Sequence, residues 1–254
     1  MQANPLLSCS ANLGVLSVSA VRLFATGRHA PRDAGECWLG LWTTVPPALK
    51  VRAVKTPIDF YFDFSSPYSY IASEWVEALA ARHGRTVRWH AIVLGAAVPT
   101  AQLDSPLSHR LERDYSHRDF GRSARFEGVP YQQPEEFPIP TQNAARVFWW
   151  LNDRRDAAGA TAWARAGLRA YFTRGVMLSQ PEALKALAAT SGLDAAQAEA
   201  AWNDAQWKAR LKRANGEAVA VGVFGAPFFV VDGEPFWGND RKAQIERWLS
   251  RGPF

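Results

Sequence analysis

Two serines, three residues apart, are the first feature of this chain that could do chemistry. Ser66 and Ser69 flank Pro67-Tyr68, after the apolar residues 58–64 and at the start of a segment with helical periodicity. A helix N-terminus stabilises an anion such as a thiolate, because it carries free N–H groups and a partial positive charge. Serine is a poor nucleophile without a base, and the motif holds neither His nor Lys. Its hydroxyl can instead donate a hydrogen bond to a bound thiolate; the alternative is that Ser66 is only the helix N-cap.

A second motif surrounds Pro227. Residues 222–233 read G-V-F-G-A-P-F-F-V-V-D-G, which places Ala226-Pro227 at the start of an apolar strand. The dipeptide Asp232-Gly233 is typical of a two-residue hairpin turn, so a partner strand is predicted to follow. A proline that merely begins a strand is the structural alternative to a functional one.

The third motif is W-G-N-D-R, residues 237–241, at the start of the last predicted helix. Asn239 and Asp240 can cap that helix. They can also bind the amino and carboxylate groups of a ligand, since Asp240 supplies charge for an ammonium and the N–H groups of the helix start receive a carboxylate. The two roles are compatible.

The elements that position these motifs alternate in type. Residues 58–64 and 86–94 are predicted strands on either side of a helix over residues 67–82, a β-α-β unit with a right-handed crossover. Helices are predicted at 107–126, 141–156, 159–174, 180–191, 194–201 and 203–215. Strands at 227–231 and 234–237 and a helix at 240–249 complete the order. The prediction is an α/β domain, β-α-β … β-β-α, over residues 56–254 with a large all-helical insertion at about 100–215.

Residues 1–55 are predicted to be an extension outside this domain. Residues 1–32 contain no Asp or Glu but include Arg22, Arg28 and Arg32. Three interpretations stay open, namely a disordered segment, a start assigned upstream of the true one, and a targeting peptide.

Composition excludes several classes of partner. The net charge is +5, and Lys and Arg alternate with Asp and Glu, so no basic stripe for nucleic acid is present and no membrane partner is expected. The two cysteines, Cys9 and Cys37, precede the predicted domain and form no redox pair, which fits a reducing compartment such as the cytoplasm. The five histidines show no metal-ligand spacing, so no metal is expected.

With these motifs in this element order, the chain resembles thioredoxin-like proteins, and among them the 2-hydroxychromene-2-carboxylate isomerase family, over about residues 57–251. That family is related to kappa-class glutathione transferases and to DsbA-type oxidoreductases. Thioredoxin-type redox proteins carry Cys-x-x-Cys where this chain has Ser66 and Ser69. The resemblance therefore implies that the sulfur comes from a bound small thiol, glutathione.

The resemblance also assigns roles. It implies that Ser66 is the catalytic residue, contacting the glutathione sulfur. It implies that the peptide bond between Ala226 and Pro227 is cis and presents its backbone to the cysteinyl part of glutathione. It assigns Asn239 and Asp240 to the γ-glutamyl end.

Two further expectations concern the inserted helices. Relatives often use a lysine there to contact the glycyl end of glutathione. No equivalent lysine is identified in this chain: Glu112 lies near the expected position, and Arg110 or Arg113 is the substitute considered. Specificity for the substrate is expected near Phe148, Trp149 and Trp150. The family also suggests a homodimer.

The reaction implied is a glutathione-dependent isomerisation of an aromatic-catabolism intermediate, by reversible thiolate addition, bond rotation and elimination. A kappa-like glutathione transferase would share the site without the elimination step. A disulfide oxidoreductase is disfavoured by the two serines. A non-catalytic thioredoxin-like binding module is the alternative outside the enzymes, and it would not need Asn239-Asp240 beside the proline loop.

Overall fold

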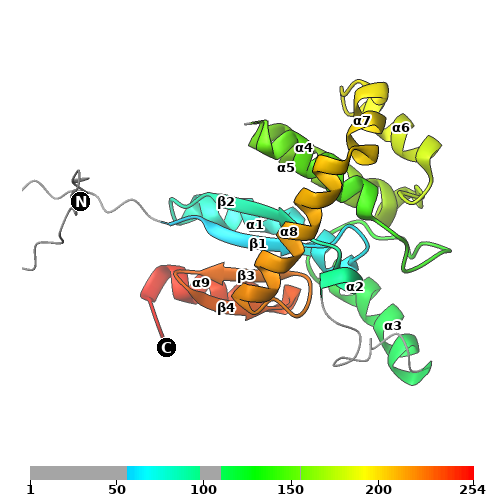
Figure 1. Ribbon diagram of the computed structural model, residues 1–254. Helices are drawn as coiled ribbons and strands as arrows, with labels where there is room; N and C mark the ends of the chain where they lie inside the picture. Colours follow the sequence, from blue (N-terminus) through cyan, green and yellow to red (C-terminus); the bar gives the residue numbers. More distant parts are fainter. Residues whose placement is uncertain (1–55, 98–109, 155) are drawn as a thin grey trace, which may run out of the picture. The chain divides into compact units, whose positions relative to one another are not determined.

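A mixed four-stranded sheet organises the part of the chain that the computed structural model describes, residues 56–97, 110–154 and 156–254 (Figure 1). The strands follow the order β2-β1-β3-β4 across the sheet and are β1 (Ile58–Phe62), β2 (Val87–Ala91), β3 (Phe228–Val231) and β4 (Glu234–Trp237). Strands β1 and β2 are parallel, whereas β3 is antiparallel to both β1 and β4. The predicted extension, residues 1–55, lies outside the described residues.

Helices separate and follow these strands. They are α1 (Pro67–Arg82), α2 (Leu94–Ala97), α3 (Arg110–Phe126), α4 (Gln142–Asp153), α5 (Ala157–Arg174), α6 (Pro181–Thr190), α7 (Ala195–Asn203), α8 (Ala205–Val221) and α9 (Lys242–Arg251), with the 3-10 turn η1 (Asn239–Arg241) before α9. Helices α3 to α8 lie between β2 and β3 in the chain, so the predicted β-α-β, helical, β-β-α order is confirmed. No helix in the described ranges combines the length and hydrophobicity needed to cross a bilayer.

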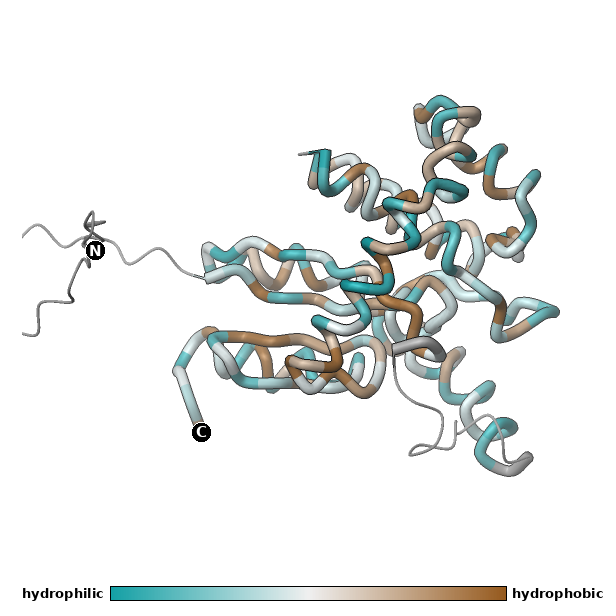
Figure 2. Tube along the Cα trace, viewed as in Figure 1, coloured by the Kyte–Doolittle hydropathy of each residue, from teal (hydrophilic) through white to brown (hydrophobic). Residues whose placement is uncertain are grey.

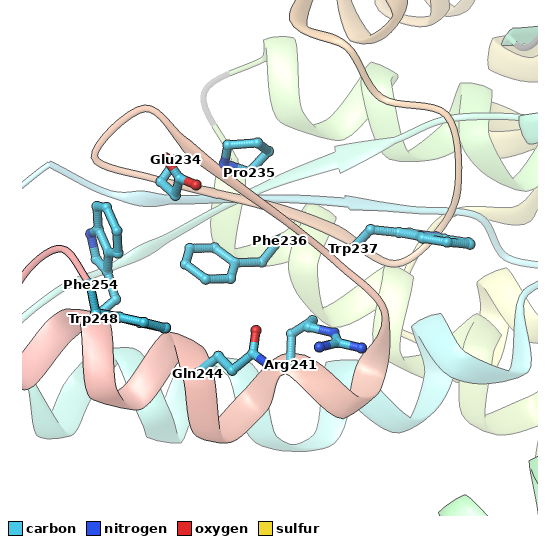
Figure 3. A pocket seen from close by; sticks show the side chains of 8 residues that line it. All are labelled: Glu234, Pro235, Phe236, Trp237, Arg241, Gln244, Trp248 and Phe254. Atoms are coloured by element: carbon cyan, nitrogen blue, oxygen red, sulfur yellow. The ribbon is translucent and has the colours of Figure 1, made fainter.

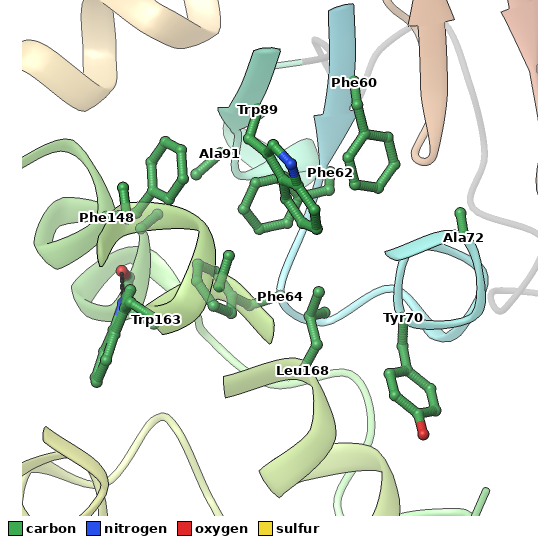
Figure 4. Close-up of a cluster of buried hydrophobic side chains, with 14 of the residues drawn as sticks. Phe60, Phe62, Phe64, Tyr70, Ala72, Trp89, Ala91, Phe148, Trp163 and Leu168 are labelled. Atoms are coloured by element: carbon green, nitrogen blue, oxygen red, sulfur yellow. Dashed lines mark hydrogen bonds between the residues drawn. The ribbon is translucent and has the colours of Figure 1, made fainter. Parts of the chain in front are cut away.

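Aromatic residues of β1 explain how the sheet is covered. Phe60 and Phe62 are fully buried on one face, and Phe60 contacts Trp89 and Phe229 with ring centroids 4.8 and 5.2 Å apart. Figure 4 shows this cluster extending to aromatic and aliphatic side chains of the inserted helices. Tyr61 points to the opposite face, because side chains alternate along a strand, and joins a smaller cluster with α8. The central strand β3, with the sequence Phe-Phe-Val-Val, is accordingly hydrophobic along its length (Figure 2).

The helical insertion corrects two expectations. Helix α8 was expected to end at Asn215-Gly216 but continues to Val221 and ends before Gly222, which adopts a positive φ of 94°. The buried Asn215 accepts a hydrogen bond from the Val93 N–H at 3.1 Å, so the tertiary contact outweighs its weak helix propensity.

The second correction concerns the expected specificity residues. Phe148, Trp149 and Trp150 are 0%, 3% and 9% exposed and belong to the hydrophobic core. Trp149 also donates from Nε1 to the Ala91 carbonyl at 2.9 Å. Phe148 and Trp149 hold α4 against the sheet and all three side chains are buried, so the expectation that they line a substrate pocket is wrong.

Candidate active site

The first serine motif forms a tight loop between β1 and α1. Ser66 has extended backbone dihedrals, its Oγ accepts a hydrogen bond from the Ser69 N–H at 3.1 Å, and Pro67 occupies the first turn of α1. The capping role predicted for Ser66 is therefore confirmed. The same hydroxyl donates to the Ala226 carbonyl at 3.0 Å, which links the serine loop to the second motif 160 residues away.

The two serines of the motif occupy different environments. Ser69 is fully buried, and its Oγ accepts a hydrogen bond from the Asp63 N–H at 3.4 Å. Ser66 is only half-buried and lies against the loop that contains the cis peptide bond between Ala226 and Pro227. The predicted cis bond is confirmed, and Ser66 is the serine whose hydroxyl faces this loop.

The Asp63 carboxylate holds the serine loop in place through hydrogen bonds. One carboxylate oxygen accepts from the Ser65 N–H at 2.8 Å and from the Thr141 hydroxyl at 3.0 Å, and the other accepts from the Leu94 N–H at 2.7 Å. Ser65 in turn accepts a hydrogen bond from the Ile139 N–H at 3.1 Å. The carboxylate thus joins the end of β1 to the start of α2 and to the segment before α4.

Burial raises the pKa of the Asp63 carboxyl, while the hydrogen bonds from Leu94, Ser65 and Thr141 act in the opposite direction. Sequence reasoning missed this residue. A carboxylate between Phe62 and Phe64, at the end of an apolar strand, was the signal that could have revealed it.

Tyr68 ties the motif to the insertion. Its hydroxyl donates to Asp119 on α3, and Arg122 and Ser123 also donate to that carboxylate. Burial and the bond to Asp119 raise the pKa of Tyr68. Burial alone would raise the pKa of Asp119, but hydrogen bonds from Tyr68 and Arg122 lower it below its usual range. The Tyr68–Asp119 pair therefore anchors α3 beside the start of α1, while Arg113 on the same helix is exposed.

The third motif lies where β4 meets α9. Asn239 is buried, and its Oδ1 accepts a hydrogen bond from Trp75 Nε1 at 3.0 Å, so its side-chain oxygen serves the fold. Asp240 is exposed and pairs with the neighbouring Arg241 at 2.7 Å. Gly238 has a φ of 109°, and a Cβ built there would lie 2.5 Å from Asp240 Oδ1. A glycine is thus required for the Asp240 carboxylate to take this position.

A partly buried ion pair holds the junction between β4 and α9 in place. Lys242, the first residue of α9, contacts Glu127 at 2.5 Å and lies 5.7 Å above the ring of Trp75. Glu127 follows α3, so the start of α9, directly after the turn that carries Asp240, is connected to the inserted helices as well as to α1.

An open groove of about 330 Å³ runs between β4 and α9 (Figure 3). It is lined by Glu234, Pro235, Phe236, Trp237, Arg241, Gln244, Trp248 and Phe254. Trp237 stands at the end of β4 nearest the third motif.

The structure brings the predicted residues to one edge of the sheet, the one formed by the end of β1, the start of β3 and the end of β4. Ser66 and Ala226 are in direct contact. Residues 226–227 and 237–240 are joined because the Gly238 N–H donates to the Pro227 carbonyl at 3.1 Å. This edge offers a hydroxyl at a helix N-terminus, a loop peptide and an exposed carboxylate. That set suits a small peptide-like thiol, which needs a donor for its sulfur, a main chain to pair with and a charge for its amino group.

Comparison with known proteins identifies the family of this chain. Residues 57–250 match the DSBA-like thioredoxin domain family. A 2-hydroxychromene-2-carboxylate isomerase of Sphingobium xenophagum is 30% identical over 194 residues, covering 76% of this chain and 97% of the relative. Glutathione S-transferase kappa 2 of Caenorhabditis elegans is 23% identical, covering 78% and 92%.

Among solved structures, a 2-hydroxychromene-2-carboxylate isomerase superposes with a TM-score of 0.68 at 27% identity, covering 76% of this chain and 94% of its own. The family match covers most of the chain, and the relative from Sphingobium xenophagum is covered almost completely. The chain therefore belongs to the DSBA-like thioredoxin domain family and, within it, to the family of the 2-hydroxychromene-2-carboxylate isomerases.

Proposed function

We propose that this protein is a glutathione-dependent isomerase of the 2-hydroxychromene-2-carboxylate isomerase type. The observation that carries the proposal is the hydrogen bond from Ser66 Oγ to the Ala226 carbonyl, 3.0 Å long, which brings the cysteine-free motif against the cis-proline loop. The isomerases among its relatives supply the reaction class.

Each residue has a defined task in this proposal. The Ser66 hydroxyl turns from the Ala226 carbonyl to donate to the ligand's sulfur, at the N-terminus of α1, where the helix dipole favours a negative charge. The Ala226 peptide pairs with the ligand's main chain. Asp240, which is exposed beside this loop, receives the α-ammonium of the γ-glutamyl group, and the main chain at Asn239 lies next to it.

Bound glutathione would supply a thiolate that adds reversibly to the conjugated double bond of an unsaturated carbonyl compound. The addition would convert that bond into a single bond, which can rotate before elimination of the thiolate re-forms the double bond. The contribution of this chain is to hold the sulfur anionic and to orient it. A serine suits that task, because Ser66 can stabilise a thiolate without forming a disulfide with it. The Asp63 network keeps the Ser66 loop in position.

The kappa-class relatives favour glutathione transfer as the second candidate. The two reactions differ in the fate of the thiol, because an isomerase returns glutathione and a transferase consumes it. The cytoplasm, which is rich in glutathione, is the compartment that we propose for either reaction.

Three measurements test the proposal. Millimolar glutathione is expected to raise the melting temperature of the wild type. 2-Hydroxychromene-2-carboxylate is expected to isomerise with glutathione in catalytic amount, with no loss of free thiol. Stoichiometric loss of thiol would support the transferase instead. The absence of both stabilisation and turnover at any glutathione concentration would reject both enzymes.

A further inference from the structure

Two exposed aromatic side chains lie in contact beside the candidate active site. Phe224 is 45% exposed and Trp237 is 54% exposed, and their ring centroids are 4.8 Å apart with an interplanar angle of 64°. Phe224 precedes the cis-proline loop, and Trp237 is the last residue of β4. Exposed aromatic residues are common singly, but a contacting pair next to a polar site is typical of a ligand-binding surface.

The position of Trp237 is fixed by the sheet and by a glycine. Trp237 pairs with Phe228 in the register of β3 and β4, at the start of β3. A Cβ built on Gly225 would lie 2.2 Å from Trp237 Nε1, so the indole rests directly on the Gly225 backbone. The next residue is Ala226, whose carbonyl accepts the hydrogen bond from Ser66. The indole is therefore one residue away from the peptide that faces the serine.

The pair is held in place without being part of the core. Phe224 also contacts Phe228 edge to face, with centroids 5.6 Å apart. Along β4, Phe236 is buried and packs on Trp248 of α9, whereas the ring of Trp237, at the end of the groove, packs against Phe224 and Gly225 (Figure 3). Phe224 and Trp237 thus present an aromatic surface that is about half exposed to solvent.

We infer that Phe224 and Trp237 form an aromatic wall that binds the planar, conjugated ring of the small-molecule substrate. This inference rests on the proposed function and adds the residues that bind the ring of the substrate. A flat π-system can stack on or pack edge-to-face against the exposed rings, which an aliphatic substrate cannot do. The wall borders the Ser66–Ala226 contact, so a ring bound to it lies next to the place proposed for the reacting sulfur.

Trp237→Ala tests the aromatic wall, because loss of a substrate-binding contact should change KM and leave kcat nearly unchanged. The variant is expected to raise KM for 2-hydroxychromene-2-carboxylate about tenfold at saturating glutathione, with kcat and the glutathione Kd changed less than about twofold. Trp237→Phe keeps an aromatic face and is expected to recover most of the loss. Phe224→Leu keeps apolar volume on a separate element and is expected to raise KM about threefold, which preserves the test if Trp237→Ala does not fold.

Phe254→Ala is the matched control. Phe254 is also an exposed aromatic residue in contact with another one, Trp248, but it lies at the C-terminus, away from the serine loop. Its KM is expected to stay at the wild-type value. An unchanged KM in both Trp237→Ala and Phe224→Leu would overturn the inference. A change in sedimentation coefficient that accompanies the loss would also overturn it, since the pair would then be an interface between two copies of this chain.

Direct binding separates this inference from the proposed function. Coumarin-3-carboxylate is a stable, planar aromatic carboxylate whose Kd can be measured by calorimetry without glutathione. A Kd about tenfold weaker in Trp237→Ala than in the wild type would support the wall even if no glutathione-dependent turnover were found. Normal turnover together with an equal Kd in the two proteins would reject the wall and leave the proposed function standing.

Discussion

The two edges of the sheet where its strands end use polar groups in opposite ways. At the edge with the serine loop, the Asp240 carboxylate is exposed and pairs only with its neighbour in sequence, Arg241, among the ion pairs of the described chain. At the opposite edge, the Arg85 guanidinium binds both carboxylate oxygens of Asp232 at 2.7 and 2.8 Å and the Thr56 carbonyl at 2.8 Å. One edge leaves charge available for a ligand, and the other uses it to join the start of β1 to the β3–β4 turn.

The comparison separates residues that bind from residues that stabilise. Variants of the first edge should change activity with little effect on folding, and variants of the second should do the reverse. Asp63 is an exception to this division. It lies at the edge with the serine loop, but it is buried and its hydrogen bonds hold three segments together.

Asp63→Asn is expected to give the largest effect. The carboxylate now accepts hydrogen bonds from Ser65, Thr141 and Leu94. The NH2 group of an asparagine would face at least one of these donors, and two donors cannot form a hydrogen bond with each other. We expect a loss of about 3 kcal/mol in the free energy of unfolding, measured by urea denaturation. Thr141→Val, which removes one of these bonds, should cost about 1 kcal/mol. A fully stable Asp63→Asn variant would contradict the network.

Ser66→Ala is expected to lower kcat/KM about 100-fold, equivalent to about 2.7 kcal/mol, because a donor to the sulfur is lost. The hydroxyl also caps α1, so Ala should cost about 1 kcal/mol of stability as well. Ser66→Gly separates the two roles, since glycine is an adequate N-cap but has no hydroxyl. Full turnover in Ser66→Gly would leave Ser66 only as a cap.

Asp240→Ala is expected to weaken glutathione binding about tenfold, or about 1.4 kcal/mol, because the carboxylate for the α-ammonium is removed. The readout is the glutathione-dependent shift in melting temperature. Glu246→Ala is the control, since Glu246 is an exposed carboxylate on α9 that pairs with Arg82. An equal loss in both variants would indicate a general field effect instead of a binding contact.

Asp232→Asn is expected to give the smallest effect, confined to stability. Hydrogen bonds from Arg85 lower the pKa of Asp232 from 3.8 to about 2 in the folded protein. Because the pKa is lower in the folded protein than in the unfolded chain, ionised Asp232 stabilises the fold at pH values above the unfolded-state pKa. This contribution is present at neutral pH and is lost as the pH falls from about 4 to about 2. Asp232 is more than one-third exposed, and solvent screening leaves roughly 1 kcal/mol. Turnover should match the wild type, and a stability gap unchanged near pH 2 would argue against the ion pair.

Much of the fold and part of the site could be predicted from local patterns. The bounds of α1 and β4, the Asp232-Gly233 turn and the cap at Ser66 follow from periodicity, turn residues and capping chemistry. Each of these signals lies within a few residues of sequence. The pairing of Ser66 with Ala226 could be expected only through the family resemblance, because no local rule connects residues 160 positions apart.

The remaining features depend on contacts between distant segments. The Asp63–Thr141 bond spans 78 positions, and a lone aspartate at the end of an aromatic strand does not specify its partner. The continuation of α8 past Gly216 depends on the contact of Asn215 with Val93. Trp149 is equally suited by composition to a pocket or to the core, and only the packing of α4 decides that it is buried.

The contact between Gly225 and Trp237 constrains the order in which this edge can evolve. Any side chain at position 225 collides with the indole, since a Cβ there would lie 2.2 Å from Nε1. Enlarging position 225 first therefore forces the indole to move off the Gly225 backbone, whereas shrinking position 237 first leaves room for the new side chain. This dependence on background shows in a double-mutant cycle, where Gly225→Ala is costly beside Trp237 and nearly neutral beside a small residue.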